Sequence, residues 1–74
     1  MNKGDVFEVL IECTVPVQGL SHISLEGRVC EIVGNAVGRY QVRVWDTEHD
    51  WVVNAWYMGW FDHPEQYKLL NTAP

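Results

Sequence analysis

The segment Arg39–Phe61 constrains the fold of this chain more than any other stretch. It contains all four tryptophans, two of the three tyrosines and one of the two phenylalanines. Two runs rich in β-branched and aromatic residues, Arg39–Trp45 and Trp51–Met58, flank the short acidic loop Asp46–Asp50. We therefore expect a β-hairpin that carries much of the core and an aromatic-rich surface.

The N-terminal part of the chain predicts one strand followed by a long loop. Residues Val6–Val15 alternate, with Phe7, Val9, Ile11, Cys13 and Val15 on one face. This pattern is typical of a half-buried strand. Pro16 should end the strand, because proline cannot donate a hydrogen bond to a neighbouring strand. The segment Pro16–Glu26 keeps no period and predicts an irregular loop.

Three further segments complete the predicted sheet. A second strand is expected over Arg28–Val33, and the glycine-bounded loop Gly34–Gly38 leads from it into the aromatic hairpin. A 3₁₀ turn over Pro64–Gln66 should precede a short closing strand at Tyr67–Leu70. No segment shows a helical period, which favours an all-β fold. A length of 74 residues is enough for a single domain, so we expect one all-β domain, residues 1–74, with five antiparallel strands.

The alternation also predicts which side chains form the core. Val29 and Ile32 are natural core residues at unlike parity, and a bulge between them would bring both to one face. We expect the following side chains to be largely buried: Phe7, Val9, Ile11, Val29, Ile32, Tyr40, Val42, Val44 and Val53.

The order of strands and turns resembles an SH3-like small β-barrel. Gly4-Asp5-Val6 starts a strand, Leu25–Val29 opens the next, and Tyr40–Val44 pairs with it. The segment His63–Tyr67 is similar to the proline–tyrosine turn before the last strand of SH3 domains. The resemblance covers most of the chain and implies a five-stranded antiparallel barrel. The acidic ligand loop and consecutive aromatic pair of signalling SH3 domains are not evident, so the resemblance implies architecture alone.

Composition excludes several classes of function. Five basic residues stand against ten acidic residues, giving a net charge of −5, which disfavours the cationic footprint of a nucleic-acid-binding protein. The apolar runs are too short to span a membrane and no signal region is evident, so we expect a cytoplasmic protein without membrane contact. Cys13 and Cys30 form no disulfide framework, although a bridge between them stays an alternative.

Few residues point to catalysis or metal binding. The predicted second hairpin loop gathers Asp46, Glu48, His49 and Asp50. Such residues can bind a divalent cation or act as acid and base, but a solvated turn explains them as well. His22, His49 and His63 have no zinc-site spacing with the two cysteines. The plasmid-borne type II dihydrofolate reductases are similar in size and barrel order, but their Val-Gln-Ile-Tyr stretch has no counterpart in Trp51–Tyr57. We expect no cofactor and no metal.

The number of aromatic residues exceeds what so small a core should need. The candidate binding residues are Trp45, Trp51, Trp56, Tyr57, Trp60 and Phe61. The predicted strand Trp51–Met58 is apolar on both faces, and one barrel covers only one of them. Tryptophan and tyrosine are enriched at interfaces. We therefore expect a non-enzymatic binding module that self-associates through this strand, most simply as a dimer centred on Trp56 or Trp60.

Several alternatives stay open at this point. The aromatic face could instead hold a protein, peptide or small-molecule ligand, or the loop at Pro16–Glu26 could cover it and leave a monomer. A small enzyme could form its site between subunits, with Asp46, His49 or Asp50 in a shared cleft. The acidity also permits a phage- or plasmid-type inhibitor that masks a basic partner.

Overall fold

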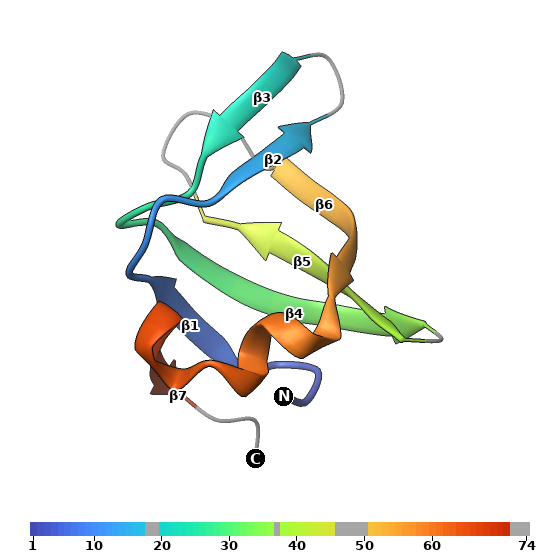
Figure 1. Ribbon diagram of the computed structural model, residues 1–74. Helices are drawn as coiled ribbons and strands as arrows, with labels where there is room; N and C mark the ends of the chain where they lie inside the picture. Colours follow the sequence, from blue (N-terminus) through green and yellow to red (C-terminus); the bar gives the residue numbers. More distant parts are fainter. Residues whose placement is uncertain (18–19, 37, 46–50, 72–74) are drawn as a thin grey trace.

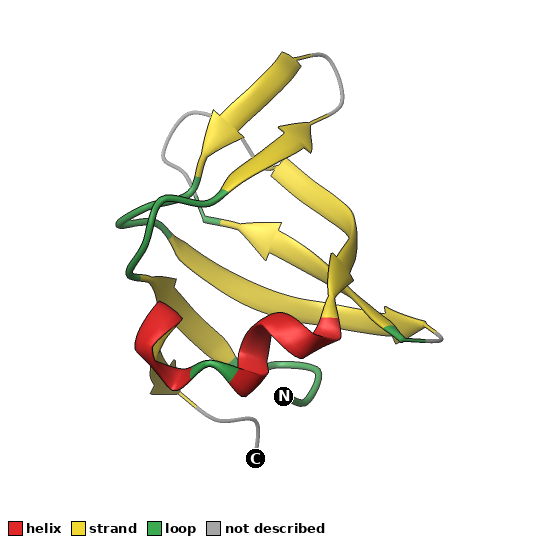
Figure 2. Ribbon diagram, in the orientation of Figure 1, coloured by secondary structure: helices red, strands yellow, loops and turns green. Residues whose placement is uncertain are grey.

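The computed structural model describes residues 1–17, 20–36, 38–45 and 51–71 of the chain. The strands are β1 (Val6–Val9), β2 (Thr14–Val17), β3 (Leu20–Ser24), β4 (Val29–Ala36), β5 (Arg39–Val44), β6 (Trp51–Tyr57) and β7 (Tyr67–Asn71) (Figure 1). Two 3₁₀ helices, η1 (Met58–Asp62) and η2 (Pro64–Gln66), join β6 to β7. The all-β class is confirmed, since strands dominate the described residues and their helical segments are short 3₁₀ turns (Figure 2).

The strands form two antiparallel sheets. Five strands make the larger sheet in the order β6-β5-β4-β1-β7, while β2 and β3 make a separate hairpin. The hairpin lies at one end of the larger sheet, where β2 contacts β6 (Figure 1). Within the described ranges neither sheet closes on itself. The predicted closed barrel of five strands is therefore corrected to an open five-stranded sheet with a two-stranded hairpin beside it.

The single strand predicted over residues 6–15 is two strands. Between them, the amide of Leu10 donates to the carbonyl of Gln66 (2.9 Å), and the carbonyl of Cys13 accepts from Leu25 (2.8 Å). These long-range bonds turn the backbone away from β1, although the side-chain alternation continues through the break. Pro16 lies within β2, in a hairpin whose register shifts between Val15 and Val17. A two-stranded ribbon with an irregularity at this point tolerates the missing donor.

The region predicted as a long loop contains β3, which pairs with β2. Likewise, β4 extends to Ala36 and takes up much of the loop predicted at residues 34–38. Gly38 has φ 72°, a left-handed conformation that glycine adopts without a steric penalty. The bulge expected between Val29 and Ile32 is not found, since the register runs without a shift from Val29 to Ile32; it shifts instead between Ile32 and Gly34, against β5. The remaining strand predictions and the 3₁₀ turn before β7 are confirmed.

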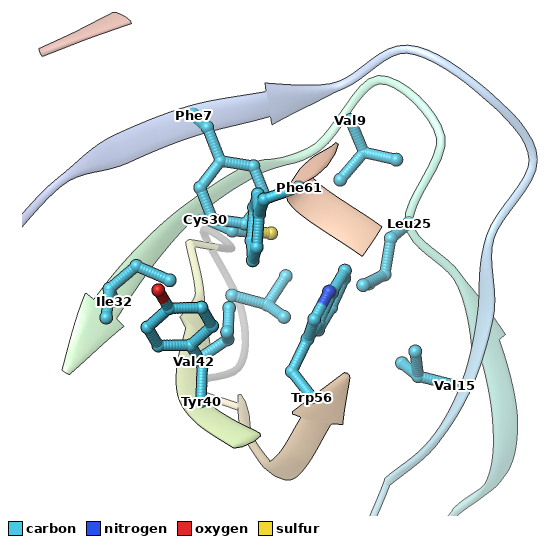
Figure 3. Close-up of a cluster of buried hydrophobic side chains, with 11 residues drawn as sticks. Phe7, Val9, Val15, Leu25, Cys30, Ile32, Tyr40, Val42, Trp56 and Phe61 are labelled. Carbon is cyan, nitrogen blue, oxygen red and sulfur yellow. The ribbon is translucent and has the colours of Figure 1, made fainter. Parts of the chain in front are cut away.

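Aromatic and aliphatic side chains from both ends of the chain form the core. The rings of Phe7, Tyr40, Trp56 and Phe61 point into the same interior space (Figure 3). Phe7 is fully buried, and its ring centroid lies 4.9 Å from that of Phe61 and 6.1 Å from that of Trp56. The full buried cluster is Phe7, Val9, Val15, Leu25, Cys30, Ile32, Tyr40, Val42, Val44, Trp56 and Phe61.

Six of the nine predicted core residues are confirmed, and two are not. Ile11 is only half-buried because it lies in the break between β1 and β2. Val29 is also half-buried, since it alternates with the fully buried Cys30 and therefore faces outward from β4. The side chain of Val53 lies outside the described part of the structure.

The N-terminal residues are fastened to the core by polar contacts. The hydroxyl of Tyr40 donates to the carbonyl of Met1 (2.8 Å), and Met1 packs partly against the core. The buried carboxylate of Asp5 accepts a hydrogen bond from the amide of Asn2 (2.8 Å). The amide of Ile32 in turn donates to the carbonyl of Asp5 (2.9 Å), which joins this turn to β4.

Replacing Tyr40 with phenylalanine should destabilise the protein by about 1 kcal/mol, the usual net value of one hydrogen bond. The ring still fills its place in the core, but the carbonyl of Met1 loses its donor. Urea unfolding followed by tryptophan fluorescence measures the change. Tyr57→Phe is the matched control, because the Tyr57 side chain is 64% exposed and should change the free energy of unfolding little. Equal effects of the two substitutions would contradict a specific role for the Tyr40 hydroxyl.

Candidate functional site

The six aromatic residues expected at the binding surface divide between core and surface. Trp56 and Phe61 are buried. Trp60 is half-buried and packs edge-on against both, at centroid distances of 5.3 and 5.1 Å. Trp45 and Tyr57 are instead 48% and 64% exposed. The side chain of Trp51 lies outside the described part of the structure.

The pairing of β5 with β6 explains this division. Residues directly opposite each other in an antiparallel pair project to the same face of the sheet. Trp56 lies opposite the buried Tyr40, while Tyr57 lies opposite the exposed Arg39. Tyr57 therefore faces away from the core, on the side of the sheet that β5 presents to solvent.

That side of the sheet is the outer face. Along β5 the side chains alternate strictly between exposed and buried, and the exposed ones share this face. On β4 the half-buried residues Val29 and Glu31 alternate with the fully buried Cys30 and Ile32 and belong to the same face. The outer face comprises Val29, Glu31, Arg39, Gln41, Arg43, Trp45 and Tyr57.

Trp45 is held in place on the outer face by two contacts with β4. Its indole Nε1 donates to Oε1 of Glu31 (3.2 Å), and its amide donates to the carbonyl of Val29 (2.8 Å). Glu31 also lies directly opposite Arg43 in the sheet. Arg43 itself makes contacts within the chain, as do Arg39 and Gln41. The indole is thus exposed and fixed in orientation, which lowers the entropy lost when a partner covers it.

Two glycines leave room for side chains on this surface. Tyr57 lies over Gly59, and a Cβ added to that glycine would meet the ring at 2.5 to 2.7 Å. Gln41 lies opposite Gly34, with its Oε1 3.5 Å from the place that a Cβ there would take. The absence of side chains at these glycines lets Tyr57 and Gln41 lie close to the backbone.

The charges on the outer face are mixed, in contrast to the acidic chain as a whole. Two of the five basic residues, Arg39 and Arg43, lie on this face, and its one carboxylate is Glu31. A locally neutral to cationic surface on a chain of net charge −5 can approach another copy of the chain without strong repulsion at the contact itself.

The groups that could support catalysis or bind metal are dispersed within the described ranges. The predicted acidic loop, with Asp46, Glu48, His49 and Asp50, lies outside them. His22 is exposed, and Nδ1 of the exposed His63 lies 3.6 Å from Oε1 of Glu65. Among the described residues, no group of three or more histidine, cysteine or acidic side chains is arranged to hold a metal ion.

The two cysteines are free thiols. Burial raises the pKa of Cys30 to about 12; Cys13 also raises it, and Arg28 lowers it. Burial also raises the pKa of Cys13. Both groups therefore favour the protonated thiol over the nucleophilic thiolate at neutral pH. The disulfide between them that the sequence left open is not formed in this structure.

In the described ranges, no helix combines the length and the hydropathy that a membrane crossing needs. No protein-family model, no curated protein and no solved structure matches this chain. The functional assignment therefore depends on the geometry of the outer face.

The sequence pattern found part of this surface and missed part of it. Strict alternation along β5 is enough to place Gln41, Arg43 and Trp45 on one face, opposite Tyr40, Val42 and Val44. Glu31 was missed, because its position depends on the register between β4 and β5. A prediction of the β4–β5 hairpin with its turn at the centre would pair residue 31 with residue 43 and so place Glu31 on this surface.

Proposed function

We propose that this protein is a non-enzymatic binding module that self-associates, most simply as a dimer, through the outer face of its larger sheet. One observation carries the proposal. Trp45 and Tyr57 are exposed on the same face, while the other aromatic side chains that the structure describes pack in or against the core.

Physical chemistry supports a contact at this face. Burying apolar surface contributes about 25 cal/mol per Å², and tryptophan and tyrosine recur among the residues that dominate interface energies. A domain of this size has a small core, and a partner subunit is a common source of additional stability. Because Trp56 is enclosed in the core of one chain, the proposed contact centres on β5 rather than on Trp56.

The resemblance to an SH3-like barrel is proposed at the level of architecture. The 3₁₀ turn η2 before the last strand supports it, as does the order of the antiparallel strands from β4 to β6. In the part of the chain that the structure describes, the β2–β3 hairpin is not paired with the five-stranded sheet, which counts against a fully closed barrel. We draw no ligand or activity from this resemblance.

Replacing Trp45 with alanine should weaken self-association by more than about 1 kcal/mol, or roughly fivefold or more in the dissociation constant, as expected of an interface hot spot. Sedimentation equilibrium over a range of micromolar concentrations measures the effect. Leu70→Ala is the matched control, because Leu70 is 45% exposed but lies on β7, at the far edge of the sheet.

A wild-type protein that sediments as a single species of 8.5 kDa would contradict self-association. The outer face would then be left as a surface for a different molecule. An equal loss of association in both variants would show that general surface hydrophobicity, rather than the outer face, drives the assembly.

A further inference from the structure

We infer that two copies of the chain pair face to face about a two-fold axis lying parallel to β4 and β5 and between them, with Glu31 of each copy against Arg43 of the other. This inference rests on the proposed self-association and specifies its geometry. The register of β4 against β5 and the chemistry of the residues that face each other across it point to this arrangement.

A two-fold axis of this kind exchanges β4 with β5 and preserves the position along the strands. Each outer-face residue of β4 then lies against a residue on β5 of the partner. That residue is the equivalent of the one that it opposes on β5 within its own sheet. The register opposes Glu31 to Arg43, and the hydrogen bond from the amide of Trp45 to the carbonyl of Val29 puts these two residues at one level. The two-fold operation turns both pairings within the sheet into contacts between subunits.

The resulting contacts are complementary in charge and polarity. A carboxylate meets a guanidinium at the centre, twice by symmetry. Next to this pair, the exposed indole of Trp45 covers the half-buried side chain of Val29 in the partner. On the other side of the centre Gly34 opposes Gln41, and the glycine adds no side chain to obstruct the approach.

Moving the axis onto either of these two strands gives poorer contacts. An axis over β5 would place Arg43 against Arg43 of the partner subunit and Arg39 against its own equivalent. An axis over β4 would place two copies of Glu31 together. Like charges in contact across an interface are unfavourable, so the position between the strands is favoured over both.

The packing of twisted sheets restricts how far this match extends. Two sheets that pack face to face lie about 10 Å apart and cross at about 30°, so strands diverge away from the crossing point. The contacts nearest the axis are therefore those of Glu31, Arg43, Val29 and Trp45. Tyr57, at the far end of β6, lies at the rim of such an interface.

Charge reversal and mixing test this geometry. Glu31→Arg and Arg43→Glu should each weaken the homodimer at least tenfold, because each change places two like-charged pairs across the axis. An equimolar mixture of the two variants should form a heterodimer, since every central pair in it is again of opposite sign. Native mass spectrometry distinguishes the heterodimer from both homodimers by mass, and sedimentation measures its dissociation constant.

Lys68→Glu is the matched control. Lys68 is exposed and opposes Glu8 between β7 and β1, as Arg43 opposes Glu31, but it lies away from the proposed axis. Its reversal should leave dimerisation unchanged. Circular dichroism checks that each variant is folded. If a reversal prevents folding, Glu31→Gln and Arg43→Gln replace it, and their effects on the dissociation constant should be non-additive.

The possible results separate this inference from the proposed function. A monomeric wild type would overturn both. A wild-type dimer that tolerates the single reversals would overturn the inference alone, as would a mixture in which association is not restored. Additive effects of the neutral variants would also overturn it. If association is restored only when one chain carries both reversals, the Glu31–Arg43 pair acts within a single subunit and the inference is overturned.

Discussion

Replacing Phe7 with alanine should cost about 3–5 kcal/mol of stability, the range found for removing a buried aromatic ring. Phe7 is fully buried, and its ring lies within 6.3 Å of the rings of Trp56, Trp60, Phe61 and Tyr67, centroid to centroid. Four aromatic neighbours would border the resulting cavity. Large, rigid rings collapse poorly into such a space, so we expect a value in the upper part of the range.

The consequence of this substitution should be global. Small domains have a total stability of about 5–15 kcal/mol, so a loss of this size leaves a substantial unfolded population at 37 °C. Thermal unfolding followed by near-ultraviolet circular dichroism measures it, since the packed tryptophans supply the signal. Phe7→Leu is the control and should cost less, because it keeps apolar volume at the site. A loss below about 1 kcal/mol for the alanine variant would contradict the central position of this ring.

Leu25→Ala should cost about 2–5 kcal/mol, whereas Ile11→Ala should cost about 1 kcal/mol or less. The alternation of residues 6–15 alone predicts the larger value for Ile11. The structure reverses this expectation, because Leu25 is fully buried and Ile11 is half-buried in the break between β1 and β2. Leu25 also holds that break in place, since its amide donates to the carbonyl of Cys13.

This pair of substitutions tests the course of the chain directly. Both remove a similar aliphatic side chain, so the comparison cancels most of the difference in transfer free energy. Urea unfolding of the two variants under one set of conditions gives the difference in stability. A larger loss at Ile11 than at Leu25 would favour one continuous strand over residues 6–15 and would contradict the separation of β1 from β2.

The parts of the fold that sequence could predict are those governed by local alternation. The buried and exposed positions of β5 follow strictly from its pattern of side chains, and the turn before β7 follows from Pro64. The break after β1 could not be predicted in this way. Alternation continues through residues 10–13, while hydrogen bonds to Gln66 and Leu25, distant in sequence, decide where the strand ends.

The candidate site shows the same division between local and long-range information. The pattern of its own strand is enough to place Trp45 on the face opposite the buried Val42 and Val44. Trp56 is expected at the contact surface but is buried, because the sequence of β6 is apolar at both parities and does not show which face meets the core. Its burial depends on pairing with Tyr40, next to an irregularity in register between Tyr40 and Val42. Such a shift exchanges the faces of a strand and leaves no clear sign in the sequence.

One of the two edge strands of the larger sheet, β7, bears on how far any assembly can grow. β7 is five residues long, carries Lys68, and pairs with β1 through a register shift between Val6 and Phe7. Short length, a lysine and an irregular ladder all make a strand edge a poor template for further strands. Fibrils grow by this kind of strand-by-strand addition, so the β7 edge disfavours polymerisation from that side of the sheet. Face-to-face contact about a two-fold axis buries the surface that it uses in both chains, so the assembly ends at two chains.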